Sequence, residues 1–390
     1  MRIVLYKGQS QYGSLRLHAD QLAQALAELG HEASIVDLLA PDANDRLKAT
    51  FDSRPDAYLG FGGVGVDIQS NGVSIYDLLG AAFASVHVDH PVHHIARLSA
   101  RVGRHAAFFL DRSHVEFVRA WPGGRSLAAV AFMPPGANEL AEPADTSDAA
   151  FAARDIGLLF TGTYRGEPGA PWRAQPEGAV RTIMEDVAQR MRADATLPIL
   201  KALDAALRHV INAPLTEDLL GKFAPVLSQP QLYAEAWHRN ALVEVLGAAG
   251  APMTVYGKGW GALAERFPSL AWGGEGSFEQ TLSLLRRARL VLNTNNGFVD
   301  GGHERVFTAM CGGAAVISDA NPWYAEAFAP AELSTFEWRA MDAVPAQIEA
   351  LLADPAALAA QARAGAAKAL AGHTWRARAQ TLVQTLSAIP

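Results

Sequence analysis

The sequence contains one cysteine, Cys311, among 390 residues. A single cysteine excludes a disulfide within the chain and a zinc site built from cysteines, and it is typical of a reducing compartment. No run approaches 18 apolar residues, and the longest runs, such as 127–133, have the length of a buried strand. The first residues lead into a strand pattern without the long apolar segment of a signal peptide. We therefore predict a cytoplasmic protein without a transmembrane segment.

Charge is also scarce, and neither sign dominates. Only 19% of the residues are charged, and the formal net charge is −7. A chain with this balance has no overall basic field for binding nucleic acid. Half of the residues are hydrophobic, which is enough for substantial cores, and the length of 390 residues predicts two domains.

The first half of the chain alternates between strand and helix patterns. A buried strand at 2–6, a helix at 18–29 and a strand at 33–38 form a βαβ unit. Further short apolar runs lie at 57–61, 85–88, 106–110 and 127–132. Alternation of this kind predicts a parallel, doubly wound sheet in an N-terminal Rossmann-like domain, residues 1–145.

A second α/β pattern follows a boundary rich in Pro, Asp, Ser and Ala. Its predicted strands are 156–161, 253–256, 290–293 and 315–318, with a helical insertion at about 177–246. We predict a second Rossmann-like domain at 155–368 and two closing helices within 346–389. The last segment, 369–390, is expected to pack back across the domain junction. Two such domains facing across a cleft would bind a ligand at the carboxyl ends of their strands.

The most specific motif is NTNNGFVDGGHERVFTAMCGGAAVISD, residues 293–319. It reads as a strand end, a polar loop and a helix that begins near His303 and stops at Gly312. The beginning of a helix binds phosphate through free N–H groups and its positive dipole end. Glu304 would accept hydrogen bonds from sugar hydroxyls and Arg305 would bind phosphate. The alternative is that Glu304 only complements the helix dipole and Arg305 pairs with a surface acid.

The run GGHERVFTAMCGGAAVISD, together with GHTWRARAQTLV at 372–383, resembles the carboxyl half of CgeB-like (spore maturation protein-like) glycosyltransferases, a bacterial branch of the GT-B superfamily. The resemblance covers about 156–386. It implies a GT-B fold of two Rossmann-like domains and a nucleotide-sugar donor held mainly by the second domain. It also implies an acceptor met by the first domain and catalysis without a cofactor or bound metal.

The sequence departs from the pattern of retaining GT-B relatives. These often carry two glutamates eight positions apart around this helix, and the matching positions here are Asp300 and Thr308. The stereochemical outcome therefore stays open.

Two glycine-containing turns follow strands of the second domain. FTGTYRG at 160–166 is placed by the resemblance beside the donor diphosphate, and YGKGW at 256–260 is placed beside the base. Asp319 follows another strand and is expected to reach sugar or ribose hydroxyls. In full, the predicted donor-binding residues are Gly162, Thr163, Arg165, Tyr256, Lys258, Asn295, Asn296, Gly297, His303, Glu304, Arg305 and Asp319.

The first domain offers acceptor contacts and a general base. Gln9 and Tyr12 lie in the turn after the first strand, and VHVDHPVHH at 86–94 ends another strand. His90 or Asp89 is the predicted base, because a neutral imidazole or a carboxylate can take a proton from an acceptor hydroxyl. The histidines of this segment also suggest a metal site, as in a metal-dependent hydrolase. Pro91 breaks the regular spacing of such ligands, however, and we predict no metal site.

Together these features predict a metal-independent glycosyltransferase of the hexosyl or deoxyhexosyl type. It would move a sugar from a nucleotide-diphosphate sugar to a hydroxyl of a glycan, protein or lipid-linked acceptor. The alternatives are a noncatalytic nucleotide- or sugar-binding protein, an epimerase, or a sugar phosphorylase of the same fold.

Overall fold

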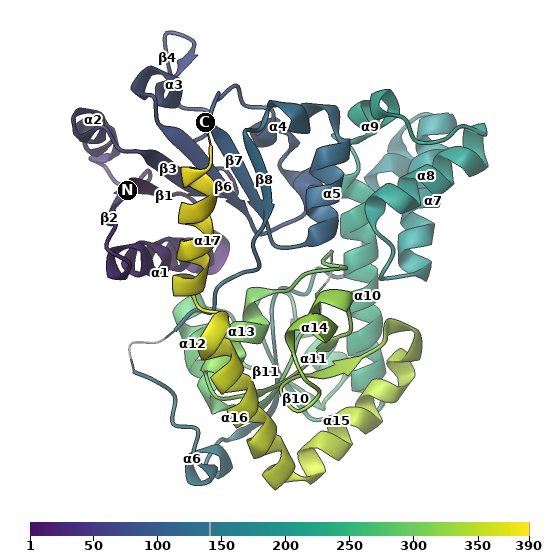
Figure 1. The fold of residues 1–390 in the computed structure, drawn as a ribbon. Helices are drawn as coiled ribbons and strands as arrows, with labels where there is room; N and C mark the ends of the chain where they lie inside the picture. Colours follow the sequence, from purple (N-terminus) through teal and green to yellow (C-terminus); the bar gives the residue numbers. More distant parts are fainter. Residues whose placement is uncertain (140–141, 296, 390) are drawn as a thin grey trace. The chain divides into compact units, whose positions relative to one another are not determined.

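The structure is a computed structural model that describes residues 1–139, 142–295 and 297–389. The chain forms two compact units, and each is built around one six-stranded parallel sheet (Figure 1). The first unit comprises Met1–Asn138, Thr216–Val226 and His373–Pro390, and the second comprises Glu139–Leu215 and Leu227–Gly372. The predicted class of two doubly wound α/β domains is confirmed.

The sheet of the first unit has the strand order β2-β1-β3-β6-β7-β8. Its strands are β1 (Arg2–Lys7), β2 (Glu32–Asp37), β3 (Ala57–Phe61), β6 (Ala82–His87), β7 (His105–Phe109) and β8 (Ala129–Phe132). Central strands β3, β6 and β7 are buried along their whole length. This burial explains why they read as continuous apolar runs, since helices cover both faces of a parallel sheet. A hairpin of β4 (Gln69–Ser70) and β5 (Val73–Ser74) stands apart from this sheet.

Helices from both ends of the chain pack on this sheet. The α-helices of the unit are α1 (Ser14–Glu28), α2 (Ala43–Ser53), α3 (Ile75–Leu79), α4 (Ile95–Leu98), α5 (Arg112–Ala120), α9 (Glu217–Phe223) and α17 (Trp375–Ser387). Leu22 and Leu26 of α1 share one core with Leu382 and Leu386 of α17, and α17 lies beside α1 in Figure 1. The last helix is therefore a structural part of the first unit.

The sheet of the second unit has the order β11-β10-β9-β12-β13-β14. Its strands are β9 (Ile156–Thr161), β10 (Met253–Tyr256), β11 (Leu270–Trp272), β12 (Ala288–Leu292), β13 (Ala315–Asp319) and β14 (Ser334–Phe336). The four central strands are the predicted ones. The two edge strands, β11 and β14, could not be predicted, because three residues are too few to show a periodic pattern.

Helices connect these strands and form the insertion between β9 and β10. The α-helices of the second unit are α6 (Asp148–Ala152), α7 (Ala179–Ala193), α8 (Ile199–Ile211), α10 (Ser228–Ala248), α11 (Gly261–Arg266), α12 (Phe278–Arg287), α13 (Glu304–Cys311), α14 (Pro322–Ala327), α15 (Val344–Ala353) and α16 (Pro355–Gly372). No helix within the described ranges is both long and apolar enough to cross a membrane.

The prediction of two closing helices is wrong in number. Residues 344–387 form three helices, α15, α16 and α17. Pro355 separates the first two, because proline has no N–H for the preceding helix but fits the first turn of a new one. Asp354 supports this start by accepting a hydrogen bond from the N–H of Ala357 at 3.0 Å.

Candidate functional site

The predicted donor motif forms a loop and a helix start at the carboxyl end of the second sheet. β12 leads into the loop, and α13 begins at Glu304 with His303 as its N-cap. Nδ1 of His303 accepts a hydrogen bond from the N–H of Arg305 at 3.2 Å, and the carboxylate of Glu304 also contacts Nδ1. The positive end of the α13 dipole therefore lies at this edge of the sheet.

Arg305 is held between two strand ends. Its Nε donates to Oγ1 of Thr161 at 2.9 Å, and its Nη1 donates to Oδ1 of Asn293 at 2.8 Å. Among the described residues no carboxylate forms an ion pair with Arg305 within 4.0 Å, so its charge is not neutralised by a direct partner. Burial lowers its pKa from the ordinary value, while the charge of Glu304 raises it. The Arg305 guanidinium is thus a fixed cation beside the turn at Gly162.

A second arginine, which sequence analysis missed, reaches the same turn. Arg239 of α10 donates from Nη1 to the carbonyl of Thr163 at 2.9 Å, and its buried Nε has no partner in the described structure. Burial lowers the pKa of Arg239 to about 10, helped by the nearby charges of Arg305 and Arg165. Arg239 therefore stays protonated at neutral pH, close to the charges of Arg305, Glu235 and Arg165.

The helix that carries Arg239, α10, also borders the loop between β12 and α13, which we call the donor loop. A Cβ on Gly297 would lie 2.4 Å from Oε1 of Glu235, which also accepts a hydrogen bond from Nε2 of Gln231 at 3.0 Å. Gln231, Glu235 and Arg239 are four residues apart and thus share one face of α10. This polar stripe was the available sequence signal, but only the fold shows that it faces the loop.

The turns after β9 and β10 run close together. The N–H of Gly162 donates to the carbonyl of Tyr256 at 2.9 Å, and the N–H of Tyr164 donates to the carbonyl of Lys258 at 2.8 Å. Lys258 itself is exposed. Tyr256 is buried and donates to Gln280 at 3.1 Å. Trp260, the last residue of the YGKGW motif, is fully buried and donates to the carbonyl of Gly162, which is the position of a core residue.

Gly257 allows the turn after β10 to lie close to the turn after β9. Its φ is +134°, and a Cβ there would lie 2.2 Å from the carbonyl oxygen of Gly162. We expect Gly257→Ala to lower the free energy of unfolding by about 2 kcal/mol or more, through backbone strain and the clash. Gly274→Ala is the matched control, since Gly274 also has a positive φ, +89°, but no atom lies within 4 Å of its Cβ position. Equal losses in the two variants, measured by urea unfolding, would contradict the proposed clash.

Asp319 holds the donor loop in place through hydrogen bonds. Its carboxylate accepts hydrogen bonds from the N–H of Asn295 at 2.7 Å and from Nε1 of Trp338 at 3.0 Å. Burial raises the pKa of Asp319 to about 6. Asn295 is also buried, and its Nδ2 has no partner in the described structure. Asp319 thus positions the loop, and its contact with a ligand hydroxyl stays a prediction.

The described donor-side residues all belong to the second unit, at the ends of β9, β10, β12 and β13 or in the segments that follow. Gly162, Thr163 and Arg165 follow β9, while Tyr256 ends β10 and Lys258 follows it. Asn296 lies outside the described residues. Arg165 is exposed and Thr163 is partly exposed.

The predicted base residues lie after β6 in the first unit. Asp89 is exposed, with Nε2 of His94 at 3.8 Å from its carboxylate. His90 is buried against the ring of His114, with ring centroids 4.4 Å apart, and burial lowers its pKa well below the ordinary value. Nδ1 of His90 accepts a hydrogen bond from the N–H of Val92, so the neutral ring carries its proton on Nε2. This tautomer makes Nε2 of His90 a hydrogen-bond donor, and the choice of Asp89 or His90 as the base stays a prediction.

Gln9 and Tyr12 lie in the turn between β1 and α1 of the first unit. Gln9 is exposed, and Tyr12 has a positive φ of 60°. Within the described ranges, no group of three His, Cys, Asp or Glu side chains is arranged to hold a metal ion.

Comparison with known proteins gives one matching family model. Residues 238–384 match the family described as "Glycosyl transferase-like", and this segment includes Arg239, Arg305 and the whole donor loop. No curated protein matches the chain.

Solved structures resemble the chain over its full length. A glycosyltransferase involved in avilamycin A biosynthesis, AviGT4, has a TM-score of 0.55 at 17% identity, covering 99% of this chain and 97% of its own. An alpha-glucosyltransferase in complex with UDP and DNA has a TM-score of 0.56 at 11% identity, covering 99% and 100%. HepE of Anabaena in complex with UDP has a TM-score of 0.51 at 12% identity, covering 100% of both chains. The chain therefore has the fold of GT-B glycosyltransferases, and its residues 238–384 match the glycosyl transferase-like family.

Proposed function

We propose that the protein is a glycosyltransferase that uses a nucleotide-diphosphate sugar without a bound metal or cofactor. The observation that carries this proposal is Arg305, a fixed cation without a carboxylate partner at the start of α13, inside the segment that matches the family model. A helix start and a guanidinium together bind a diphosphate by charge-assisted hydrogen bonds. The UDP bound by two of the structural relatives agrees with this donor class.

In the proposed reaction an acceptor hydroxyl attacks the anomeric carbon of the donor sugar. The bond between that carbon and the diphosphate oxygen breaks, and its electron pair leaves with the nucleoside diphosphate. Arg305, Arg239, Arg165 and Lys258 stabilise the negative charge that develops there. In an inverting reaction the hydroxyl proton passes to Asp89. We further propose the CgeB-like branch, a glycan, protein or lipid-linked acceptor and a cytoplasmic location.

Arg239 is expected to contribute to donor binding through charge. Arg239→Gln should weaken the affinity for a nucleoside diphosphate about tenfold, because it removes about 1.4 kcal/mol of charge-assisted binding. Arg239→Lys retains the charge and should therefore lose less of this affinity. Equal affinities for the wild type and Arg239→Gln, measured by isothermal titration calorimetry, would remove Arg239 from the site.

A thermal-shift panel tests the donor class. It uses UDP, GDP, TDP, CMP and their sugar conjugates, with either magnesium or EDTA. A ligand of the native state raises the unfolding temperature according to its concentration relative to Kd. The proposal expects one nucleotide to stabilise the protein equally in EDTA, and the matching nucleotide sugar to release its diphosphate in an Arg305-dependent reaction. Stabilisation only with magnesium would contradict metal independence.

A further inference from the structure

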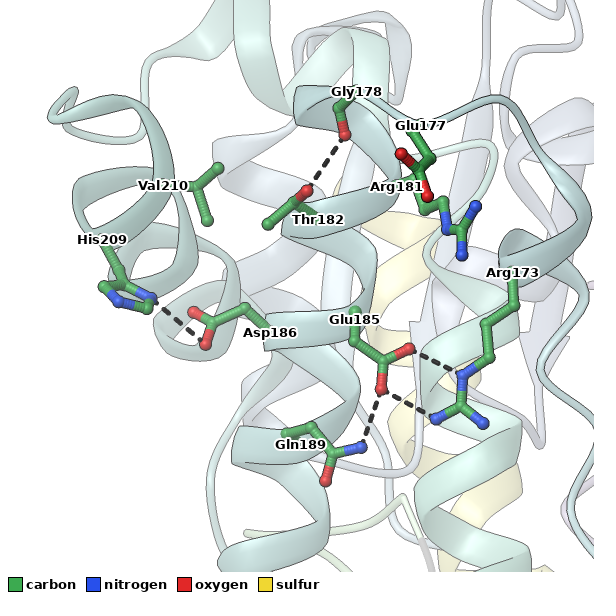
Figure 2. A pocket seen from close by; sticks show the side chains of 10 residues that line it. All are labelled: Arg173, Glu177, Gly178, Arg181, Thr182, Glu185, Asp186, Gln189, His209 and Val210. Atoms are coloured by element: carbon green, nitrogen blue, oxygen red, sulfur yellow. Dashed lines mark hydrogen bonds and ion pairs between the residues drawn. The ribbon is translucent and has the colours of Figure 1, made fainter.

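A pocket of about 580 Å³, lined mostly by residues with polar or charged side chains, lies in the helical insertion of the second unit (Figure 2). This open pocket is bordered by the 3-10 helix η4 (Pro171–Ala174) and by α7 and α8. None of the residues discussed for the donor site lines it. Its lining consists of Arg173, Glu177, Gly178, Arg181, Thr182, Glu185, Asp186, Gln189, His209 and Val210.

Part of the pocket wall is fixed by ion pairs. Glu185 accepts hydrogen bonds from Nε and Nη2 of Arg173 at 2.8 and 2.7 Å, from Gln189 at 2.8 Å and from Nε1 of Trp172 at 2.8 Å. These donors lower the pKa of Glu185 to about 2, so it stays ionised. Asp186 pairs with Arg190 at 2.7 Å. A wall ordered in this way loses little conformational entropy when it binds a ligand.

Other polar groups of the same wall remain available. Arg181 makes one hydrogen bond, from Nη1 to the carbonyl of Gln175 at 3.3 Å. Glu177 forms no ion pair or hydrogen bond with any residue that the structure describes, and Figure 2 shows it beside Arg181. Arg181, Glu185 and Gln189 follow one another at every fourth position of α7 and therefore share one face, and Glu177 lies just before the helix begins. Carboxylate acceptors and guanidinium or amide donors thus both line the pocket.

The lining excludes two classes of ligand. Two arginines stand against three carboxylates, so the pocket has no excess positive charge for a phosphate or another anion. Trp172 is fully buried and Tyr233 is 8% exposed, and the Arg173 guanidinium covers both rings, so no aromatic face is open to a nucleobase. A neutral ligand whose groups both donate and accept hydrogen bonds fits instead, and hydroxyl groups have this property.

We infer that this pocket is a saccharide-binding subsite for a neutral, hydroxyl-rich glycan, separate from the donor site. The inference rests on the proposed function only in taking that glycan to be part of an acceptor. Saccharide binding at this pocket requires no nucleotide.

Affinity electrophoresis in native gels containing dextran, mannan, a soluble β-glucan or the anionic polysaccharide alginate tests the inference. We expect at least one neutral polysaccharide to retard the protein. Arg181→Ala and Glu177→Ala should each weaken the apparent affinity about fivefold or more, as expected for the loss of one good hydrogen bond. Arg208→Ala is the control, because Arg208 is an exposed α8 residue that pairs with Asp204 outside the pocket.

The inference is overturned if no neutral polysaccharide retards the protein, if alginate alone does so, or if both pocket variants migrate like the control. Stabilisation by nucleotides should be the same in all three variants, because none of them touches the donor loop. Absence of nucleotide binding in the wild type would count against the proposed function and leave the saccharide result standing.

Discussion

Arg305→Ala is expected to lower the affinity for the nucleoside diphosphate and kcat/KM by roughly 30- to 700-fold, equivalent to about 2–4 kcal/mol. The variant loses the cation that we propose binds the diphosphate, and also the two hydrogen bonds that Arg305 makes with Thr161 and Asn293. Titration calorimetry measures the affinity, and release of the nucleoside diphosphate measures turnover.

Two comparisons separate a local effect from unfolding. Arg266→Ala removes an exposed arginine of the same unit that pairs with Glu244, and it should change neither quantity by more than about twofold. Arg305→Lys cannot bridge both strand ends, so it should lose some affinity and activity. Because it keeps the positive charge, this loss should be smaller than that of Arg305→Ala. A folded Arg305→Ala variant with normal affinity would remove Arg305 from the mechanism.

Acid should destabilise the first unit strongly. His87, His90 and His105 are buried there, and burial lowers the pKa of each, to about 4 for His105. In the unfolded chain these imidazoles gain protons below pH 6.5, while in the folded unit they stay neutral. The folded unit therefore loses stability as the pH falls below 6.5, by about 2 kcal/mol at pH 5 for His105, and the lowered pKa values of His87 and His90 add losses of the same sign.

In the second unit, Asp319 changes the pH dependence of the free energy of unfolding in the opposite direction. Its folded pKa of about 6 lies above the value of an unfolded aspartate, so the folded state binds the proton first as the pH falls. This carboxyl should add about 1.4 kcal/mol at pH 5 relative to pH 7.5.

Urea unfolding at pH 7.5 and pH 5.0 tests both contributions. Hydrogen exchange shows which unit loses stability, because β6 belongs to the first unit and β12 to the second. The peptides of the two strands are compared with each other at the same pH. His105→Gln should reduce the acid-induced loss by about 2 kcal/mol, because the amide can still form a hydrogen bond with Ser85 but does not titrate. Equal stability of β6 at the two pH values would contradict the buried neutral histidines.

Much of the fold could be predicted from the sequence because buried parallel strands read as apolar runs. The predicted bounds of β3, β9 and β10 coincide with the observed strands. The start of α13 could be placed near His303 because a polar loop and glycines precede it. Edge strands β11 and β14 could not be predicted, since a three-residue strand at the sheet margin has neither length nor periodicity.

The candidate site was less accessible to sequence reasoning. Arg239 lies in the middle of a long helix, where an arginine ordinarily faces solvent, and only tertiary packing brings it to the carbonyl of Thr163. Trp260 shows the opposite problem, because an aromatic residue after a strand can serve a ligand or the core, and here the fold buries it. The tautomer of His90 likewise depends on the N–H of Val92, a contact that no residue pattern specifies.

We propose that the second unit binds the diphosphate of a sugar nucleotide through Arg305 and the start of α13. Titration calorimetry of the full chain in EDTA, with UDP, GDP, TDP and ADP and their monophosphates, tests it most directly. We expect that one diphosphate binds, that its monophosphate binds at least about tenfold more weakly, and that Arg305→Ala abolishes this difference. Equal affinities for the diphosphate and the monophosphate, or no binding of any nucleotide at millimolar concentration, would contradict it.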